Sequence, residues 1–108
     1  MDLSWLPDDG GTGHMPPSEE VVQFWTTVKE KTGFTKLVEI GFNAGHSSSI
    51  LLTLFDDISI QSFDIGQFDI THSNAKLVKE KFGDRFNLKI TDSLKITMVE
   101  VNGADILF

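Results

Sequence analysis

A short apolar run followed by a turn that contains two glycines constrains the fold of this 108-residue chain more than any other feature. The run over residues 37–40 reads Leu-Val-Glu-Ile, which is typical of a central parallel strand buried on both faces. Gly41 and Gly45 permit a sharp turn, and serines 47–49 then open an apolar helix over residues 47–55. A strand, a glycine turn and a helix in this order predict the start of a βαβ unit.

The same alternation continues along the chain. Residues 58–63 form a second strand signal, and Ser73 and Gly83 are placed to begin and end the helix that follows. Residues 86–90 alternate strictly between apolar and polar, which favours a strand near the sheet edge. Residues 104–108 form a fourth strand signal.

Two further segments are expected to be helical. Residues 18–33 carry a capping Ser18, an apolar stripe and a terminal Gly33. Residues 94–101 fit either a helix or a strand, and we favour a short helix because a crossover is needed there. The chain is therefore predicted to have an α/β fold: a partial, doubly wound Rossmann-like sheet of about four parallel strands, in the order 3-2-1-4, with flanking helices.

Domain organisation follows from breaker density and length. Residues 1–17 are rich in Pro and Gly and predict an irregular arm. Residues 18–108 predict one Rossmann-like domain, which is shorter than a complete doubly wound domain and is expected to be truncated in its fourth strand. An unpaired apolar strand there would favour self-association.

Composition excludes several classes of partner and site. The net charge of −7 disfavours a nucleic-acid or anionic membrane partner. With no cysteine there is no disulfide or thiolate metal site, which fits the cytoplasm, and no apolar run approaches the roughly 20 residues of a membrane span. His14, His46 and His72 lack paired spacing, so no metal site is predicted.

The turn after the first strand is a candidate ligand site, because open α/β sheets bind ligands where a strand meets a helix. Asn43 stands where a dinucleotide fingerprint would have its central glycine. Glu39 would repel a phosphate but suits a cationic ligand. Considered alone, Glu39 could equally be an exposed strand-end charge, and Gly41 and Gly45 could make a plain tight turn.

Two more acids follow later strands. Asp64 comes 19 residues after Gly45, close to the interval of about 20 at which such folds place a ribose-binding carboxylate. Asp92 and Ser93 follow the third strand, where Asp92 could accept a hydrogen bond from an exocyclic amine or cap a helix.

This series of motifs over residues 37–108 resembles the N-terminal part of class I S-adenosylmethionine-dependent methyltransferases, in the small-molecule O-methyltransferase or methyltransferase-24-like branch. There the first motif is acidic-x-Gly-x-x-x-Gly without the central glycine. The resemblance implies that S-adenosylmethionine is the cofactor. It also implies which residues bind the parts of this cofactor: Glu39 the methionine amino group, Asp64 the ribose, and Ile65, Asp92 and Ser93 the adenine. The turn contributes the further cofactor-binding residues Gly41, Phe42, Asn43, Gly45 and Ser47.

The resemblance also implies the reaction, a direct transfer of the sulfonium methyl group to an acceptor that is expected to be a small molecule. No catalytic residue is assigned, because the acid that often serves as base in the family lies just beyond the fourth strand. Two alternatives stay open. One is the nicotinamide-dinucleotide-binding half of a dehydrogenase. The Asp64 interval supports this alternative, and the lack of a central glycine at Asn43 opposes it. The other is a truncated Rossmann-like fragment without catalysis.

Overall fold

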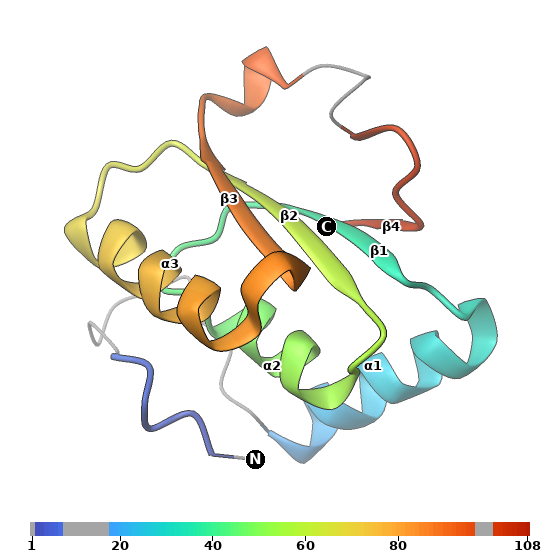
Figure 1. Cartoon of the computed structure of the whole chain (residues 1–108). Helices are drawn as coiled ribbons and strands as arrows, with labels where there is room; N and C mark the ends of the chain where they lie inside the picture. Colours follow the sequence, from blue (N-terminus) through green and yellow to red (C-terminus); the bar gives the residue numbers. More distant parts are fainter. Residues whose placement is uncertain (1, 8–17, 97–100) are drawn as a thin grey trace.

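The chain is described by a computed structural model that covers residues 2–7, 18–96 and 101–108. Figure 1 shows its elements along the chain, which are α1 (Glu19–Thr32), β1 (Lys36–Ile40), α2 (His46–Leu54), β2 (Ser59–Asp64), α3 (Asp69–Phe82), η1 (Gly83–Arg85), β3 (Phe86–Ile90), η2 (Ser93–Lys95) and β4 (Ile106–Leu107). No helix among these residues is long and apolar enough to cross a membrane.

The sheet is parallel and has the order β3-β2-β1-β4. In register, Leu37 lies between Ile60 of β2 and Ile106 of β4, and Ile60 in turn lies beside Phe86 of β3. The predicted α/β fold, with four parallel strands in the order 3-2-1-4 and flanking helices, is confirmed. β1 is internal and β3 is at one edge, as the apolar run and the alternating pattern predicted.

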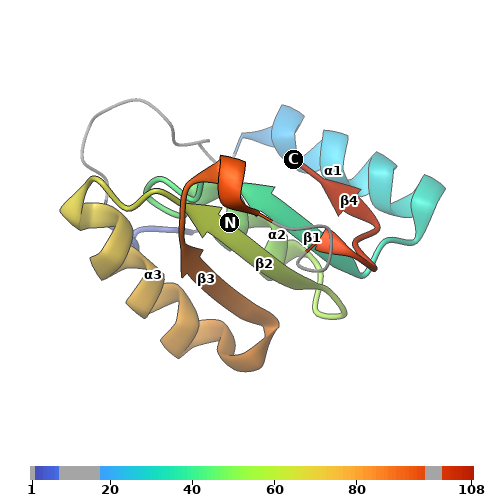
Figure 2. The ribbon, with the colours of Figure 1, turned by 90° about the horizontal axis from the view of Figure 1, so that it is seen from above.

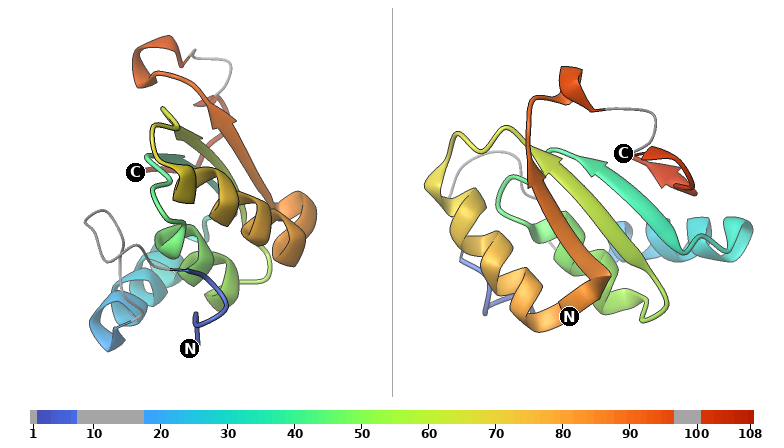
Figure 3. Two further views of the ribbon diagram at one scale, coloured as in Figure 1. Left: turned by 90° about the vertical axis from the view of Figure 1, so that its left-hand side faces the viewer. Right: turned by 45° about the horizontal axis from the view of Figure 1, so that its top comes forward.

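Helices α1, α2 and α3 pack against one face of the sheet, as Figures 2 and 3 show. Because side chains alternate across a strand, every second residue of each strand faces these helices. One buried core results, and it joins Trp25 of α1, Leu51 and Leu52 of α2, Ala75 and Val78 of α3, and strand residues Leu37, Ile60 and Phe86.

Most helix boundaries follow the predicted caps, but one does not. Ser18 Oγ accepts from the Val21 amide at 3.3 Å, and Gly33 ends α1 with φ of 64°. The prediction that Ser73 caps the third helix is wrong, because α3 already begins at Asp69 and Ser73 lies inside it. An acidic first-turn residue suits the positive end of a helix, and Ser73 Oγ instead donates to the Ile70 carbonyl at 3.3 Å.

The ends of the chain are only partly described. Residues 2–7 lie along α3 as irregular backbone, with Leu3 and Leu6 buried, whereas the rest of the predicted arm falls outside the described residues. The predicted helix over residues 94–101 shows a 3₁₀ turn, η2, at its start, and residues 97–100 lie outside the described part. The strand predicted over residues 104–108 is present as β4, Ile106–Leu107, and the Phe108 amide just after it donates to the Val38 carbonyl at 2.9 Å.

Candidate functional site

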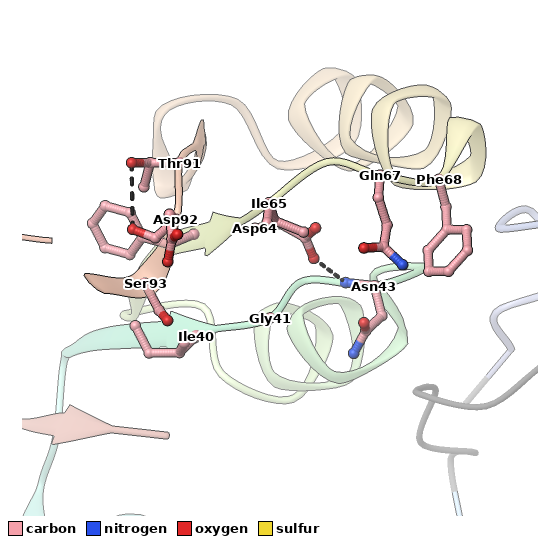
Figure 4. Close-up of a pocket in the computed structure, with 11 residues that line it drawn as sticks. Ile40, Gly41, Asn43, Asp64, Ile65, Gln67, Phe68, Thr91, Asp92 and Ser93 are labelled. Atoms are coloured by element: carbon pink, nitrogen blue, oxygen red, sulfur yellow. Dashed lines mark hydrogen bonds between the residues drawn. The ribbon is translucent and has the colours of Figure 1, made fainter. Parts of the chain in front are cut away.

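A pocket of about 380 Å³ lies at the carboxyl ends of β1, β2 and β3, where parallel α/β sheets bind ligands. Figure 4 shows Asp92 and Ser93 at one end of it, Gln67, Phe68 and Asn43 at the other, and Asp64 between them. The described residues that line it are Ile40, Gly41, Asn43, Phe63, Asp64, Ile65, Gln67, Phe68, Thr91, Asp92 and Ser93.

The structure brings together only part of the predicted site. The pocket is lined by the predicted residues Gly41, Asn43, Asp64, Ile65, Asp92 and Ser93. The predicted residues that lie outside its lining are Glu39, Phe42, Gly45 and Ser47. The lining residues that the sequence analysis missed are Ile40, Phe63, Gln67, Phe68 and Thr91. The misplaced start of α3 hid Gln67 and Phe68, since both directly precede its true first residue, Asp69.

The Asp64 carboxylate accepts a backbone hydrogen bond at each of its two oxygens. Its Oδ2 accepts the backbone amide of Asn43 at 2.9 Å, and its Oδ1 accepts the backbone amide of Gly66 at 2.8 Å. Each carboxylate oxygen has further lone pairs. The side chain is therefore oriented by the protein and can still accept hydrogen bonds from two neighbouring hydroxyl groups of a ligand.

The glycine loop, residues 41–45, has a backbone that only certain residues tolerate. Gly41 and Gly45 have φ of 92° and 87°, and Asn43 has φ of 56°. At Gly45 a Cβ atom would lie 2.4 Å from Cζ of Phe42, whose buried ring packs 5.3 Å from that of Phe86. Phe42 and Gly45 therefore shape the loop from the core side rather than line the pocket.

Glu39 is neither an exposed strand-end charge nor part of the lining. It is 2% exposed, and its Oε1 accepts the hydroxyls of Ser48 at 2.6 Å and Ser62 at 2.7 Å. Burial raises the pKa of Glu39 from 4.5 to about 7; the Ser48 and Ser62 hydroxyls lower the pKa, and the nearby Asp64 charge raises it. Glu39 thus joins β1 to α2 and β2 immediately before the glycine loop.

Helix α3 supports the glycine loop through two buried polar side chains. Thr71 Oγ1 donates to the Asn43 carbonyl at 2.8 Å, and Asn74 Nδ2 donates to the Ala44 carbonyl at 2.8 Å. Both side chains belong to fully buried residues. The sequence analysis missed them, although polar residues on the buried face of an amphipathic helix are a signal that a hydrogen-bonding partner faces them.

At the other end of the pocket, Asp92 caps the short turn η2. Its Oδ1 accepts the Leu94 amide at 2.9 Å, so the capping role that the sequence left open is present. The Thr91 amide donates to the Asp64 carbonyl oxygen at 2.8 Å, which ties this end to β2. Asp92 and Ser93 still line the pocket and can accept hydrogen bonds from a ligand.

The electrostatic character of the pocket selects among ligands. Among the described residues that line it there are two carboxylates, Asp64 and Asp92, and no Lys, Arg or His. A neutral or cationic ligand with hydroxyl donors suits such a lining, whereas a diphosphate would face like charge. Within the described ranges, no group of three His, Asp or Glu residues could hold a metal ion.

No protein-family model matches the chain, and no curated protein matches it. Among solved structures, it is similar to a protein described as a "putative caffeoyl-CoA O-methyltransferase" from Staphylococcus aureus, with a TM-score of 0.65 and 18% sequence identity. The match covers 83% of this chain and 44% of that protein, so this chain spans less than half of its length. The two proteins share a Rossmann-like α/β fold.

Proposed function

We propose that the chain is the cofactor-binding portion of an S-adenosylmethionine-dependent methyltransferase that acts in the cytoplasm on a small-molecule acceptor. One observation carries the proposal: the Asp64 carboxylate lies at the end of β2, oriented by two backbone amides, in a pocket whose described lining includes acids and no basic side chain. The fold shared with an O-methyltransferase-like protein supports it.

The cofactor fits the pocket by the chemistry of its parts. Asp64 would accept both ribose hydroxyls, which is a charge-assisted arrangement. The apolar side chains of Ile40 and Ile65, which are 41% and 60% exposed, would cover the adenine, and Asp92 and Ser93 would accept from its amine.

The methionine part would lie over the glycine loop. Gly41 and Asn43 line the pocket there, and the residues outside the lining, Phe42, Gly45 and Ser47, would act by shaping the loop. A ligand that carries an ammonium and a sulfonium group would favour the ionised form of Glu39, whose pKa burial raises to about 7, so that Glu39 would contribute negative charge rather than a direct contact.

The chain's own contribution to the reaction would be positioning. When bound, the cofactor supplies a methyl group already activated by the positive sulfur, so that a substrate nucleophile forms its bond to carbon as the carbon–sulfur bond breaks. Residues around Asp64 and the glycine loop would fix the direction from which the methyl group is presented. Orientation of this kind supplies a large part of catalysis in such displacements.

Calorimetric titration with S-adenosylhomocysteine, the reaction product, tests the proposal. We expect binding by the wild-type chain and affinity at least about tenfold weaker for Asp64→Ala, since charge-assisted hydrogen bonds contribute about 1.5–3 kcal/mol. Asp56→Ala removes an equal charge from an exposed turn between α2 and β2 and should leave binding unchanged. A folded wild-type chain that binds no S-adenosylhomocysteine would refute the proposal.

The two alternatives give different results in parallel assays. Enhanced NADH fluorescence on mixing with the chain would favour the dinucleotide-binding half of a dehydrogenase, which shares the ribose-binding position of Asp64. We expect none, because the lining residues that the structure describes include no cation to pair with a diphosphate. A non-catalytic fragment would bind no cofactor, and turnover of S-adenosylmethionine by this chain would exclude it.

A further inference from the structure

A single side-chain amide joins the glycine loop to the N-terminal segment. Asn74 Nδ2 lies 2.8 Å from the Ala44 carbonyl and 2.7 Å from the Pro7 carbonyl. An asparagine amide carries two protons, so it can donate one to each carbonyl. The residue is fully buried in α3, where a lost hydrogen bond is not replaced by water.

The N-terminal segment, residues 2–7, is attached to the domain independently of this amide. Leu3 and Leu6 are 7% and 3% exposed, and Leu6 belongs to the main core. The Trp5 ring packs edge-on against Phe82 at 6.1 Å, and Lys81 Nζ lies 4.9 Å from its centre. The segment therefore runs along α3, with Trp5 near the helix end and Pro7 at Asn74.

The glycine loop, which accepts one of the two hydrogen bonds from the Asn74 amide, also holds Asp64 in the pocket. Asn43, next to Ala44, donates its amide to Asp64 and accepts at its carbonyl from Thr71. Its φ of 56° lies in the left-handed region. Such a conformation persists only where surrounding contacts determine it, so contacts behind the loop affect how Asp64 is presented.

We infer that residues 2–7 form a brace that holds the glycine loop in its ligand-binding shape through Asn74, and that Asn74 is a positioning residue for the site. Apolar contacts fasten the brace to α3, and the two hydrogen bonds of Asn74 transmit its position to the loop. The effect on ligand affinity rests on the proposed function, whereas the effect on loop shape does not.

A pair of leucine truncations tests the brace without touching Asn74 or the pocket. Leu6→Ala loosens residues 2–7, and Leu52→Ala removes an equally buried leucine from the far end of α2. Amide hydrogen exchange at residues 41–45 is measured under native conditions. We expect exchange about tenfold faster in Leu6→Ala, by local opening, and in Leu52→Ala only the change that its global stability dictates.

Equal effects of the two truncations on the loop, after correction for global stability, would overturn the inference. Asn74→Leu, which has similar volume and no donor, should give the same local opening as Leu6→Ala. Asn87→Leu is its control, because the Asn87 amide donates to Gln61 at 2.9 Å and contacts no residue of the loop in the described bonds. If Asn74→Leu does not fold, the leucine pair still decides.

Ligand affinity provides the second measurement. In Leu6→Ala, we expect S-adenosylhomocysteine to bind about fivefold to tenfold more weakly than in Leu52→Ala, although neither leucine lines the pocket. Equal affinities in these two variants would also count against the brace. If the wild-type chain binds no S-adenosylhomocysteine, the proposed function fails, and the exchange comparison alone determines whether the brace stands.

Discussion

The backbone amide of Asn43 donates to Asp64 Oδ2 across 2.9 Å, so the glycine loop after β1 and the acid at the end of β2 hold each other in place. Gly66 completes the arrangement by donating its own amide to Oδ1 at 2.8 Å. Asp64 therefore has a structural role even without ligand, and its substitution should affect both stability and binding.

Asp64→Asn separates the charge from the shape. An asparagine side chain has one acceptor oxygen, so its NH₂ group would face either the Asn43 or the Gly66 amide. Because Asp64 is half-buried, we expect a loss of about 1 kcal/mol in the free energy of unfolding, measured by urea denaturation. Asp56→Asn, in an exposed turn, should change stability little. Equal stability of the two variants would contradict this account of Asp64.

Gly45→Ala tests whether Phe42 determines the loop. The added Cβ would lie 2.4 Å from Phe42 Cζ at a φ of 87°, so strain and overlap combine. We expect destabilisation of about 2–4 kcal/mol. Gly33→Ala is the matched control, because its φ is 64° and nothing lies within 4 Å of the added atom, so the loss should be only the left-handed backbone cost of about 1 kcal/mol. Thermal or urea denaturation that shows similar losses would exclude a packing role for Gly45.

The sequence predicted those features that depend on local patterns. Continuous and alternating apolar runs placed β1 inside the sheet and β3 at its edge, because burial on one or two faces leaves a direct pattern in the residues. The interval from Gly45 to Asp64 predicted an acid at the end of the second strand, close to the ligand-binding turn. In the structure Asp64 is hydrogen-bonded to the glycine loop. These signals span few residues and need no knowledge of packing.

Contacts between distant segments could not be predicted in the same way. Asn74 bonds to carbonyls 30 and 67 residues away, and nothing near Asn74 in the sequence specifies either partner. The family resemblance implied that Glu39 contacts a ligand. Whether its side chain contacts a ligand or the buried hydroxyls of Ser48 and Ser62 depends on the packing of α2 and β2. Such placements follow from tertiary structure alone.

Glu39→Gln should change the pH dependence of stability. Burial raises the pKa of Glu39 from 4.5 to about 7 in the folded chain, so the folded state binds a proton more tightly than the unfolded state. Its contribution to stability is then complete below about pH 4.5 and is lost as pH rises to about 7, by at most about 3 kcal/mol. Glutamine keeps an acceptor oxygen for the two serine hydroxyls and does not titrate.

Urea denaturation of the chain between pH 5 and pH 8 measures this contribution. We expect wild-type stability to fall over the interval relative to Glu39→Gln. Glu30→Gln, which alters an exposed acid on α1, should follow the wild type. Parallel pH profiles for wild type and Glu39→Gln would show that the folded state does not favour the protonated carboxyl.

The outer edge of β4 is a candidate surface for association between copies of the chain, as the sequence analysis predicted. Among the described strands, β4 pairs only with β1, and its Leu107 is 61% exposed. An apolar strand with unpaired backbone groups favours pairing with another chain, and a charged side chain on such an edge opposes it. We expect sedimentation to show association that increases with concentration and is reduced by Leu107→Lys. Leu94→Lys places the same charge at a leucine that is 91% exposed and lies outside β4, so it should leave association intact. A wild-type chain that stays monomeric at all concentrations would exclude pairing through this edge.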